Sequence, residues 1–385
     1  MLSETTTRQR PAAPEELIPN DFGTRPAGAL KTVQLGEYTF ETGGYLPEVT
    51  LAYETWGQLN AAGDNAVLVA HALTGDSHVA SSEADPSIGW WEGLLGPGRP
   101  IDTQKWFVIA PAMVGGCYGS TGPASLDPEG IPWGSRFPFV TIRDSVHLEH
   151  RLARHLGIAG FHTVIGGSMG GARALEWAAT YPDFVRGVAV FACGAAATAE
   201  QIAFGQAQVL AVENDPAYRG GDYYPGSGPQ AGLGLARRIA HITYRTEDEL
   251  QVRFGRDAQA GENPFGSAAR RQGRYQVESY LDHQASKLVR RFDPNAYITL
   301  TEALMSHDVG RDRGGVEAAL ASVTATPFLA AVDTDRLYYP AQSQQIADAV
   351  PGDHGVHIIS SPIGHDGFLT SAEQLGDAMR ATLGL

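Results

Sequence analysis

The sequence Gly-Gly-Ser-Met-Gly-Gly at residues 166–171 places one serine, Ser168, among small residues. It fits the pattern G-x-S-x-G, in which a serine lies on a sharp turn between a buried strand and a helix. Small neighbours are needed there because a Cβ atom would collide with the flanking strand or helix. A Gly-rich phosphate-binding turn is the alternative, but the pattern G-x-G-x-x-G and the P-loop lysine are both missing. Ser168 is therefore the candidate nucleophile.

A serine hydroxyl needs a base to take its proton and a carboxylate to fix the tautomer of that base. With such a turn, the chain order is serine, then Asp or Glu, then histidine. Asp333 and Asp335 both follow an apolar run at residues 327–332. We choose Asp335, because Asp333 lies nearer the strand and suits the ordinary role of bonding turn amides. His365, in a Gly-flanked loop after the last apolar run, is the expected base.

Acyl chemistry at a serine also needs two amide donors for the oxyanion. The amide after the nucleophile, that of Met169, supplies one. The second comes from a loop after an early strand, and residues 71–75, His-Ala-Leu-Thr-Gly, follow such a run. Leu73 is our choice, although His71 and Gly75 could instead only shape a turn.

Two other groups of reactive side chains are weaker candidates. His147, Glu149 and His150 resemble a zinc helix, but their spacing matches neither H-E-x-x-H nor H-x-x-E-H, and a solvated helix face is the simpler interpretation. Cys117 lies in a Gly-rich loop without a strand-to-helix turn or a recognisable base. We therefore expect no metal site and no catalytic cysteine.

The elements that must position these residues alternate along the chain. Unbroken apolar runs predict buried strands, and apolar residues at helical spacing predict the helices between them. The predicted strands are residues 66–70, 106–110, 162–165, 185–191, 327–332 and 356–359, and the predicted helices are residues 141–156, 172–180, 342–350 and 372–383. This alternation predicts a mostly parallel sheet.

The remaining segments define the expected domains. Residues 31–40 and 46–55 alternate around a Thr-Gly-Gly turn, which predicts an antiparallel hairpin. Residues 193–324 show helical segments broken by Gly and Pro, which predicts a helical cap inserted into a core of residues 31–192 and 325–385. Residues 1–30 hold no apolar run long enough for a signal peptide or a membrane span, so we expect a mobile arm and a cytoplasmic protein.

Composition limits the partners of the chain. Among 385 residues, 43% are hydrophobic and 18% charged, which suits a globular protein with a large core. The net charge of -15 argues against a nucleic-acid partner, because binding phosphates needs a basic face. Only two cysteines occur, so we expect no disulfide framework.

Several motifs together resemble one family. These are residues 51–57 (Leu-Ala-Tyr-Glu-Thr-Trp-Gly), 71–78 (His-Ala-Leu-Thr-Gly-Asp-Ser-His), 89–91 (Gly-Trp-Trp), the serine turn with 174–177 (Ala-Leu-Glu-Trp), and 306–310 (Ser-His-Asp-Val-Gly). With them, nearly all of the chain after Lys31 resembles the homoserine O-acetyltransferases, acyl-CoA-dependent enzymes of methionine biosynthesis. The resemblance implies an α/β-hydrolase fold, a mostly parallel sheet with an inserted helical cap.

The resemblance also implies an activity and its residues. Acetyl would pass from acetyl-CoA, a co-substrate, to the hydroxyl of L-homoserine by a ping-pong mechanism, with no cofactor and with a homodimer as the assembly. Ser168, Asp335 and His365 match the catalytic triad of the family. Arg237, with Arg238 beside it as the alternative, matches an arginine that holds the homoserine carboxylate, and Asp366 matches the ligand of the amino group.

Departures and alternatives accompany this interpretation. The pair Ala172-Arg173 stands where relatives often carry Met-Gln; we expect it to face the helix and to put little of the interpretation in doubt. A homoserine O-succinyltransferase, a serine O-acyltransferase or, more distantly, a serine ester hydrolase would use the same scaffold and triad. A non-catalytic binding protein is a further alternative, which the intact serine, base and carboxylate disfavour.

Overall fold

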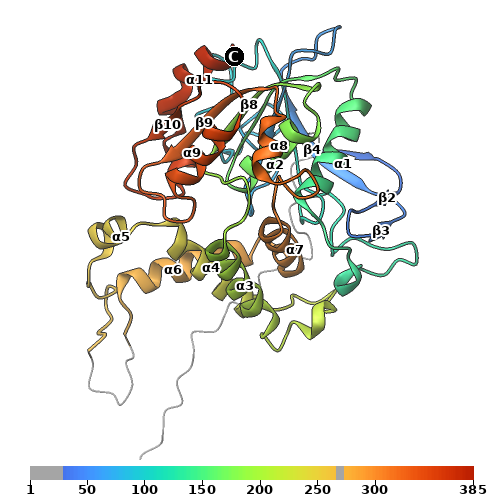
Figure 1. The fold of residues 1–385 in the computed structure, drawn as a ribbon. Helices are drawn as coiled ribbons and strands as arrows, with labels where there is room; N and C mark the ends of the chain where they lie inside the picture. Colours follow the sequence, from blue (N-terminus) through green and yellow to red (C-terminus); the bar gives the residue numbers. More distant parts are fainter. Residues whose placement is uncertain (1–28, 266–272) are drawn as a thin grey trace, which may run out of the picture.

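An eight-stranded sheet forms the centre of the molecule (Figure 1). The computed structural model describes residues 29–265 and 273–385, so nearly all of the predicted arm lies outside the described residues. The strand order is β1-β4-β6-β5-β7-β8-β9-β10. The strands are β1 Lys31–Gln34, β4 Thr50–Trp56, β5 Ala66–Ala70, β6 Phe107–Pro111, β7 Phe161–Gly167, β8 Val185–Phe191, β9 Thr326–Val332 and β10 Val356–Ile359.

Strand direction follows the predicted alternation. The six strands from β6 to β10 pair in parallel, whereas β1 and β4 pair antiparallel at one side of the sheet. The predicted hairpin is confirmed but divided, because a second ribbon, β2 (Tyr38–Thr39) with β3 (Tyr45–Leu46), stands apart from the main sheet. Gly36, with a φ of +74°, separates β1 from β2. The fold is thus the predicted α/β architecture.

Both faces of the sheet are covered by helices. Along β5, Leu68 belongs to one buried cluster and its neighbours Val67 and Val69 to the other, as expected where side chains alternate between faces. One face carries α1 (Ile142–His155), α2 (Met169–Thr180) and α9 (Pro340–Ala349), and the other α10 (Gly367–Thr370) and α11 (Gly376–Leu383). The predicted closing helix over residues 372–383 begins as a 3₁₀ turn, Ala372–Leu375, and continues as α11.

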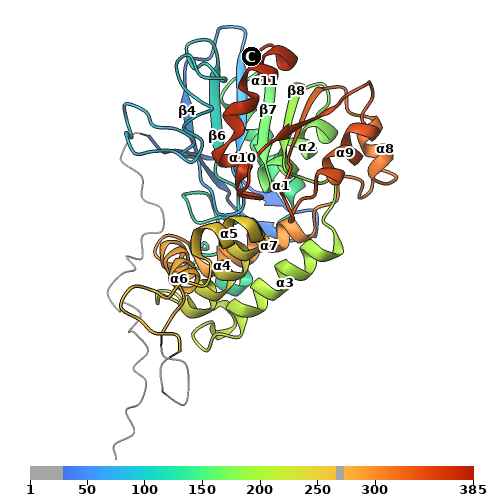
Figure 2. The same cartoon turned by 90° about the vertical axis from the view of Figure 1, so that its left-hand side faces the viewer.

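The part of the chain that connects β8 to β9 forms a layer of helices, which lies below the sheet in Figures 1 and 2. It consists of α3 (Ala199–Glu213), α4 (Gln230–Tyr244), α5 (Glu247–Phe254), α6 (Gln276–Val289) and α7 (Pro294–Met305). The sixth helix of this insertion, α8 (Val316–Ala321), instead packs beside α9. The predicted cap over residues 193–324 therefore includes one helix that lies with the core. Among the described helices, none has the length and apolar content that crossing a membrane requires.

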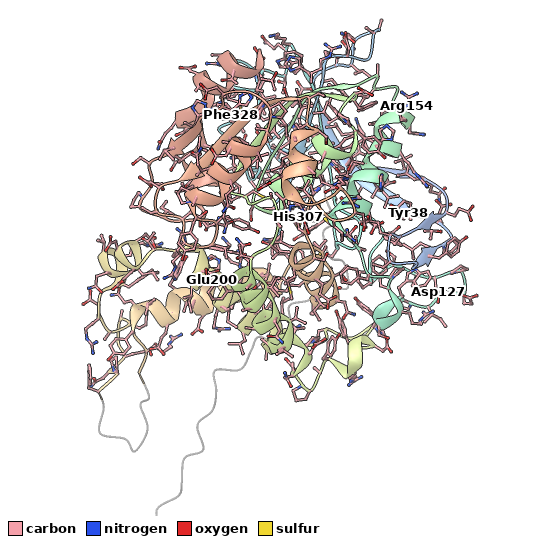
Figure 3. The ribbon with its side chains drawn as sticks, in the orientation of Figure 1. Tyr38, Asp127, Arg154, Glu200, His307 and Phe328 are labelled. Carbon is pink, nitrogen blue, oxygen red and sulfur yellow. The ribbon has the colours of Figure 1, made fainter. Side chains whose placement is uncertain are left out.

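The two connections between core and cap lie side by side. His307, labelled in Figure 3, accepts a hydrogen bond through its carbonyl from the Ala197 amide (2.8 Å), and the Val309 amide donates to the Ala195 carbonyl (3.0 Å). Beyond this junction, Arg313 reaches back to the Glu176 carboxylate on α2 (2.6 Å).

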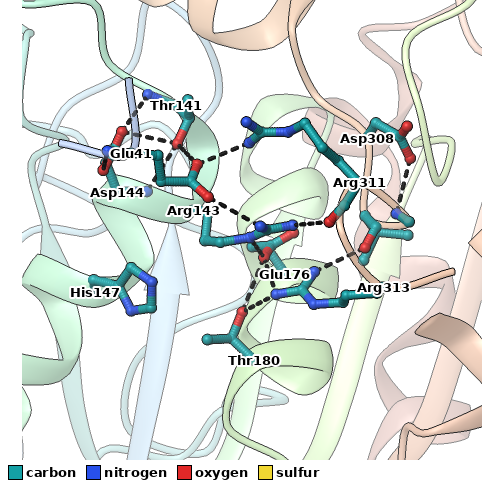
Figure 4. Close-up of polar contacts among 12 residues, drawn as sticks. Glu41, Thr141, Arg143, Asp144, His147, Glu176, Thr180, Asp308, Arg311 and Arg313 are labelled. Carbon is teal, nitrogen blue, oxygen red and sulfur yellow. Dashed lines mark hydrogen bonds and ion pairs between the residues drawn. The ribbon is translucent and has the colours of Figure 1, made fainter. Parts of the chain in front are cut away.

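Charged side chains secure the returning connection to the core. Arg143 on α1 also binds Glu176 (2.7 Å), and it binds Glu41 as well (2.9 Å), which in turn pairs with Arg311 (2.8 Å), as Figure 4 shows. The network fixes residues 311–313 to α1 and α2. Ion pairs therefore fix the connection that returns from the cap to the core.

Candidate active site

Ser168 occupies a strained turn between β7 and α2. Its φ of 54° and ψ of -124° lie outside the ordinary regions for a residue with a side chain. A Cβ on Gly166 would overlap the carbonyl of Gly170, and one on Gly170 would overlap the carbonyl of Ala70. The flanking glycines are therefore required by close backbone approach, as the sequence predicts, and they hold the serine at the C-terminal end of its strand.

The structure brings Asp335 and His365 together from the ends of β9 and β10. His365 Nδ1 lies 2.7 Å from Asp335 Oδ2, and both side chains are buried. The other carboxylate oxygen accepts the amides of Leu337 (2.8 Å) and Tyr338 (2.9 Å), which fixes the carboxylate. With Nδ1 held by Asp335, the opposite ring nitrogen is the one available to a nucleophile.

Asp333, the alternative carboxylate, has a different role. Its two oxygens accept the amide of Ser361 and the hydroxyl of Ser360, each at 3.0 Å. These bonds join the loop after β9 to the loop after β10. Asp333 thus holds the turn, and the geometry favours Asp335 as the partner of the base.

Burial and the neighbouring carboxylates shift the pKa of His365 in opposite directions. Burial disfavours the charged imidazolium, but the Asp335 carboxylate, through its charge and its hydrogen bond, and then the charge of Asp366, outweigh burial and raise the pKa above its ordinary value. The imidazole is thereby made a stronger base.

A pocket beside Ser168 is lined by core and cap residues together, including Leu73, Tyr244 and Tyr338. The rings of Tyr244 and Tyr338 also contact the His365 ring, at centroid distances of 5.7 and 5.3 Å. The imidazole therefore adjoins the wall of the serine pocket. No hydrogen bond joins Ser168 to His365 among the described residues; such contacts often close only when a substrate is bound.

Of the two predicted oxyanion residues, Leu73 lines this pocket and Met169 directly follows Ser168. Met169 is the first residue of α2, and Leu73 lines the pocket from the loop after β5. His71 shapes that loop, because its Nδ1 contacts the Ala72 carbonyl (2.8 Å) and its Nε2 accepts the Met113 amide (2.9 Å). Burial and then the charge of Arg173 lower the pKa of His71 to about 3, so its ring is neutral.

Arg173 has a larger role than its sequence position suggests. It is fully buried, and its Nε and Nη2 donate to Glu149 Oε1 on α1 at 3.0 and 2.6 Å. The remaining donors reach the carbonyls of His71 (3.4 Å) and Pro111 (3.1 Å). The side chain joins the helix after Ser168 to α1 and to the loop of Leu73, and the departure at this position leaves the family interpretation intact.

The two neighbouring arginines of α4 differ in pairing. Arg238 Nη2 lies 2.6 Å from Asp282 on the surface of the cap. Arg237 has only a long contact to the Thr74 hydroxyl (3.4 Å), lies over the Tyr244 ring, and keeps a buried Nε without a hydrogen bond. Within residues 29–265 and 273–385, no carboxylate pairs with Arg237. Of the two, Arg238 has a carboxylate partner, and Arg237 has none among the described residues.

Asp366 follows the histidine and faces the cap. Its Oδ2 lies 3.1 Å from Nη2 of Arg245, the residue that ends α4. Arg245 was not singled out from the sequence, because nothing in the local pattern links residues 121 positions apart. Asp366 directly follows His365 in the chain, and its role as the ligand of the substrate amino group stays a prediction.

The weaker candidates are accounted for by packing. His147 Nδ1 contacts the Tyr181 hydroxyl (2.7 Å), and the His150 ring stacks on the same tyrosine. Burial raises the pKa of Cys117, so its thiol is not activated. In the part of the chain that the structure describes, no three His, Cys, Asp or Glu side chains gather to hold a metal ion.

Comparisons with known proteins agree with this architecture. The family described as alpha/beta hydrolase fold matches residues 65–371. The homoserine O-acetyltransferase of Thermobifida fusca is 54% identical over 363 residues, covering 93% of this chain and 94% of that protein. The crystal structure of homoserine O-acetyltransferase from Bacillus anthracis is similar, with a TM-score of 0.85, 26% identity and coverage of 93% and 98%. Esterase E22 also matches, with a TM-score of 0.84, 26% identity and coverage of 92% and 99%. The chain belongs to the homoserine O-acetyltransferase family within the α/β-hydrolase fold.

Proposed function

We propose that this chain transfers the acetyl group of acetyl-CoA to the side-chain hydroxyl of L-homoserine, a step of methionine biosynthesis, through an acetyl-serine at Ser168. One observation supports the acyl chemistry above all: strained Ser168 opens on a pocket whose tyrosine walls contact the His365 ring, and that ring is fixed by Asp335. Family membership supports the choice of substrates.

In the first half-reaction, His365 takes the proton of Ser168, and the serine oxygen attacks the thioester carbonyl. The amides of Met169 and Leu73 stabilise the oxyanion, and one such donor typically contributes ~3 kcal/mol to the transition state. The C–S bond then breaks and the thiolate leaves, taking the proton from His365, so that the imidazole is neutral again for the second half-reaction. Because a thiol has a pKa near ~8.5, the leaving group needs little help from an acid.

In the second half-reaction, His365 takes the proton of the homoserine hydroxyl, which attacks the acetyl-serine, and Ser168 leaves with that proton. Arg237 would bind the acceptor carboxylate with its free donors, and Asp366 would bind the ammonium. Holding both ends of the amino acid places its hydroxyl, rather than water, at the acetyl group.

An ester hydrolase is the second candidate, because esterase E22 shares the fold over nearly the whole chain. It differs from a transferase in the fate of the acetyl-serine, which water would cleave. The unpaired donors of Arg237 favour the transferase, since a hydrolase has no need to bind an anionic acceptor.

The proposal extends to the setting of the enzyme. Acetyl-CoA acts as a co-substrate, without a bound cofactor, in the cytoplasm. A homodimer is supported by apolar side chains left exposed on the cap, among them Leu235, Ile242 and Val252.

The test is the intact mass of the protein after brief exposure to acetyl-CoA. We expect the gain of one acetyl group, its loss on adding L-homoserine, and no gain in Ser168→Ala. Loss of the acetyl group at the same rate with buffer alone would identify a hydrolase. If free thiol release with both substrates does not exceed that of the Ser168→Ala control, the proposed function is wrong.

A further inference from the structure

The end of α4 and the residues after it, 242–246, pack against the loop that carries His365. Thr246 Oγ1 donates to the Pro362 carbonyl (2.7 Å), and Arg336 donates to the Ile242 carbonyl. At Gly364, a Cβ would approach the Tyr244 carbonyl to 2.8 Å. The helix that carries Arg237 is therefore seated directly on the loop of the base, and Arg245 lies at this contact.

Arg245 and Asp366 form the charged part of the contact. Their side chains are only 15% and 18% exposed, so water screens the pair weakly compared with a surface pair. Arg245 also approaches Glu249 (3.6 Å), and its Nε is buried without a hydrogen bond. Ordering this guanidinium beside Asp366 has a cost in desolvation, which its partners offset only in part.

Asp366 uses one oxygen for this pair. Oδ2 faces Arg245, whereas Oδ1 accepts no hydrogen bond from any residue that the structure describes. A carboxylate held by one oxygen cannot rotate freely, and its second oxygen then has a fixed direction. An ammonium arriving at a fixed oxygen loses less side-chain freedom on binding than one that must also order the carboxylate.

We propose that Arg245 is a positioning residue for the acceptor: it holds Asp366 by one oxygen so that the other receives the amino group of the substrate. This inference rests on the proposed function, since it concerns the amino-acid acceptor of that site. It adds a residue whose effect falls mainly on the second half-reaction, because acetyl-CoA presents no ammonium to Asp366.

The alternative role for Arg245 is to fasten the cap to the core. A fastening role would affect both half-reactions and the thermal midpoint, without regard to the amino group of the acceptor. A positioning role affects discrimination between homoserine and 4-hydroxybutanoate, which is the same hydroxy acid without the amino group. The two roles are therefore separable by the choice of acceptor.

The experiment compares Arg245→Gln with the wild-type enzyme. We expect the rate of acetylation of Ser168 by acetyl-CoA to stay within twofold, and the preference in kcat/KM for homoserine over 4-hydroxybutanoate to narrow about tenfold, mainly through the KM for homoserine. Arg245→Lys should restore part of the preference. Arg253→Gln is the matched control. Arg253 also pairs with Glu249 (2.6 Å), but its guanidinium lies over the rings of Phe254 and Tyr280 instead of beside Asp366.

A double-substitution cycle covers the case in which Arg245→Gln does not fold. Asp366→Asn should narrow the preference by itself, and adding Arg245→Lys to it should change little further, because the two residues act through one contact. An unchanged preference in Arg245→Gln, or equal losses in both half-reactions, would overturn the inference while leaving the proposed function intact. If the wild-type enzyme releases no thiol with acetyl-CoA and homoserine, the proposed function itself fails.

Discussion

Arg173 in the core and Arg237 in the cap differ in how many hydrogen-bond partners their guanidinium groups have. The guanidinium of Arg173 has a carboxylate and two carbonyls as partners, and it is wholly buried. Arg237 has one long contact, to the Thr74 hydroxyl, and its buried Nε has no hydrogen-bond partner among the described residues. Because an unsatisfied buried polar group is costly, it persists where a ligand will satisfy it. For these two residues, the paired charge belongs to the scaffold and the charge without a carboxylate partner belongs to the proposed acceptor site.

The acidic residues near Ser168 follow the same division. Both oxygens of Asp335 are taken, by His365 and by two amides, so the base is oriented before a substrate arrives. Asp366, at the contact with the cap, keeps one oxygen without a hydrogen bond to the residues that the structure describes. The core thus supplies preorganised chemistry, and the contact with the cap leaves polar groups that the proposed acceptor would pair.

The largest expected effect is on the chemistry of the core. Replacing Asp335 with Asn removes the carboxylate that fixes the tautomer of His365, and kcat should fall by about 10⁴-fold, as expected for loss of this role in a triad. Single-turnover release of thiol from acetyl-CoA measures the effect on the first half-reaction.

Asp333→Asn is the control for that variant. Asp333 bonds only the loop of Ser360 and Ser361, so kcat should stay within about threefold while stability falls by about 1 kcal/mol. Equal losses of kcat in the two variants would contradict the assignment of Asp335 as the partner of the base.

Arg173→Met tests the scaffold half of the comparison. It leaves Glu149 buried and uncompensated, and breaking such a pair typically costs about 3–5 kcal/mol of unfolding free energy. Urea unfolding followed by circular dichroism measures the loss. Arg173→Met with Glu149→Gln should recover part of it, because the unpaired charge is then gone. A loss below about 1 kcal/mol would show that this pair does not hold the scaffold.

Arg237→Met tests the binding half. The kcat/KM for homoserine should fall about 100-fold, equivalent to the ~3 kcal/mol expected of a hydrogen-bonded charge pair, while acetylation of Ser168 stays within threefold. The thermal midpoint should fall little, because only the long contact to the Thr74 hydroxyl and the position over the Tyr244 ring are lost. Arg238→Met, which breaks only the surface pair with Asp282, should leave kcat/KM within twofold. A lower midpoint in Arg237→Met without an effect on homoserine would reverse the comparison.

Local sequence patterns predicted the elements and the chemistry of the core. The strands β5, β8 and β10 begin and end at the predicted residues. The apolar run of β5 is buried along its whole length, whereas β8 carries the exposed Arg186 and the edge strand β10 is only partly buried. The strained Ser168 follows from its glycines, which a packed strand-to-helix turn requires. The helix after Ser168 begins at Met169 rather than at Ala172, because the turn itself starts the helix.

Pairing between distant side chains could not be predicted in this way. Arg173 and Glu149 lie on different helices, and neither periodicity nor spacing shows that they face each other. Arg245 and Asp366 come from the cap and the core and meet only in the folded chain. The family resemblance offered two neighbouring arginines of α4 for the proposed carboxylate contact, and the pairing of Arg238 with Asp282 favours Arg237.

The smallest expected effect, a shift in pH dependence, separates the two regions most directly. His365 must be neutral to accept the proton of Ser168, so the rate of acetylation should rise with pH through the pKa of His365. Although burial lowers that pKa, the charge and hydrogen bond of Asp335 raise it above the ordinary ~6.5, and the acid limb of the rate profile should lie at correspondingly higher pH.

In Asp335→Asn the acid limb should move to lower pH, because burial still lowers the pKa of His365 and the carboxylate that raised it is gone. In Arg237→Met it should stay where it is, because Arg237 is not among the groups that set this pKa. Thiol release measured across the range in which histidine titrates gives the limb for each variant. A limb that moves equally in both variants would mean that the cap tunes the base as well as the acceptor, and the division between paired and unpaired charge would not be a division of function.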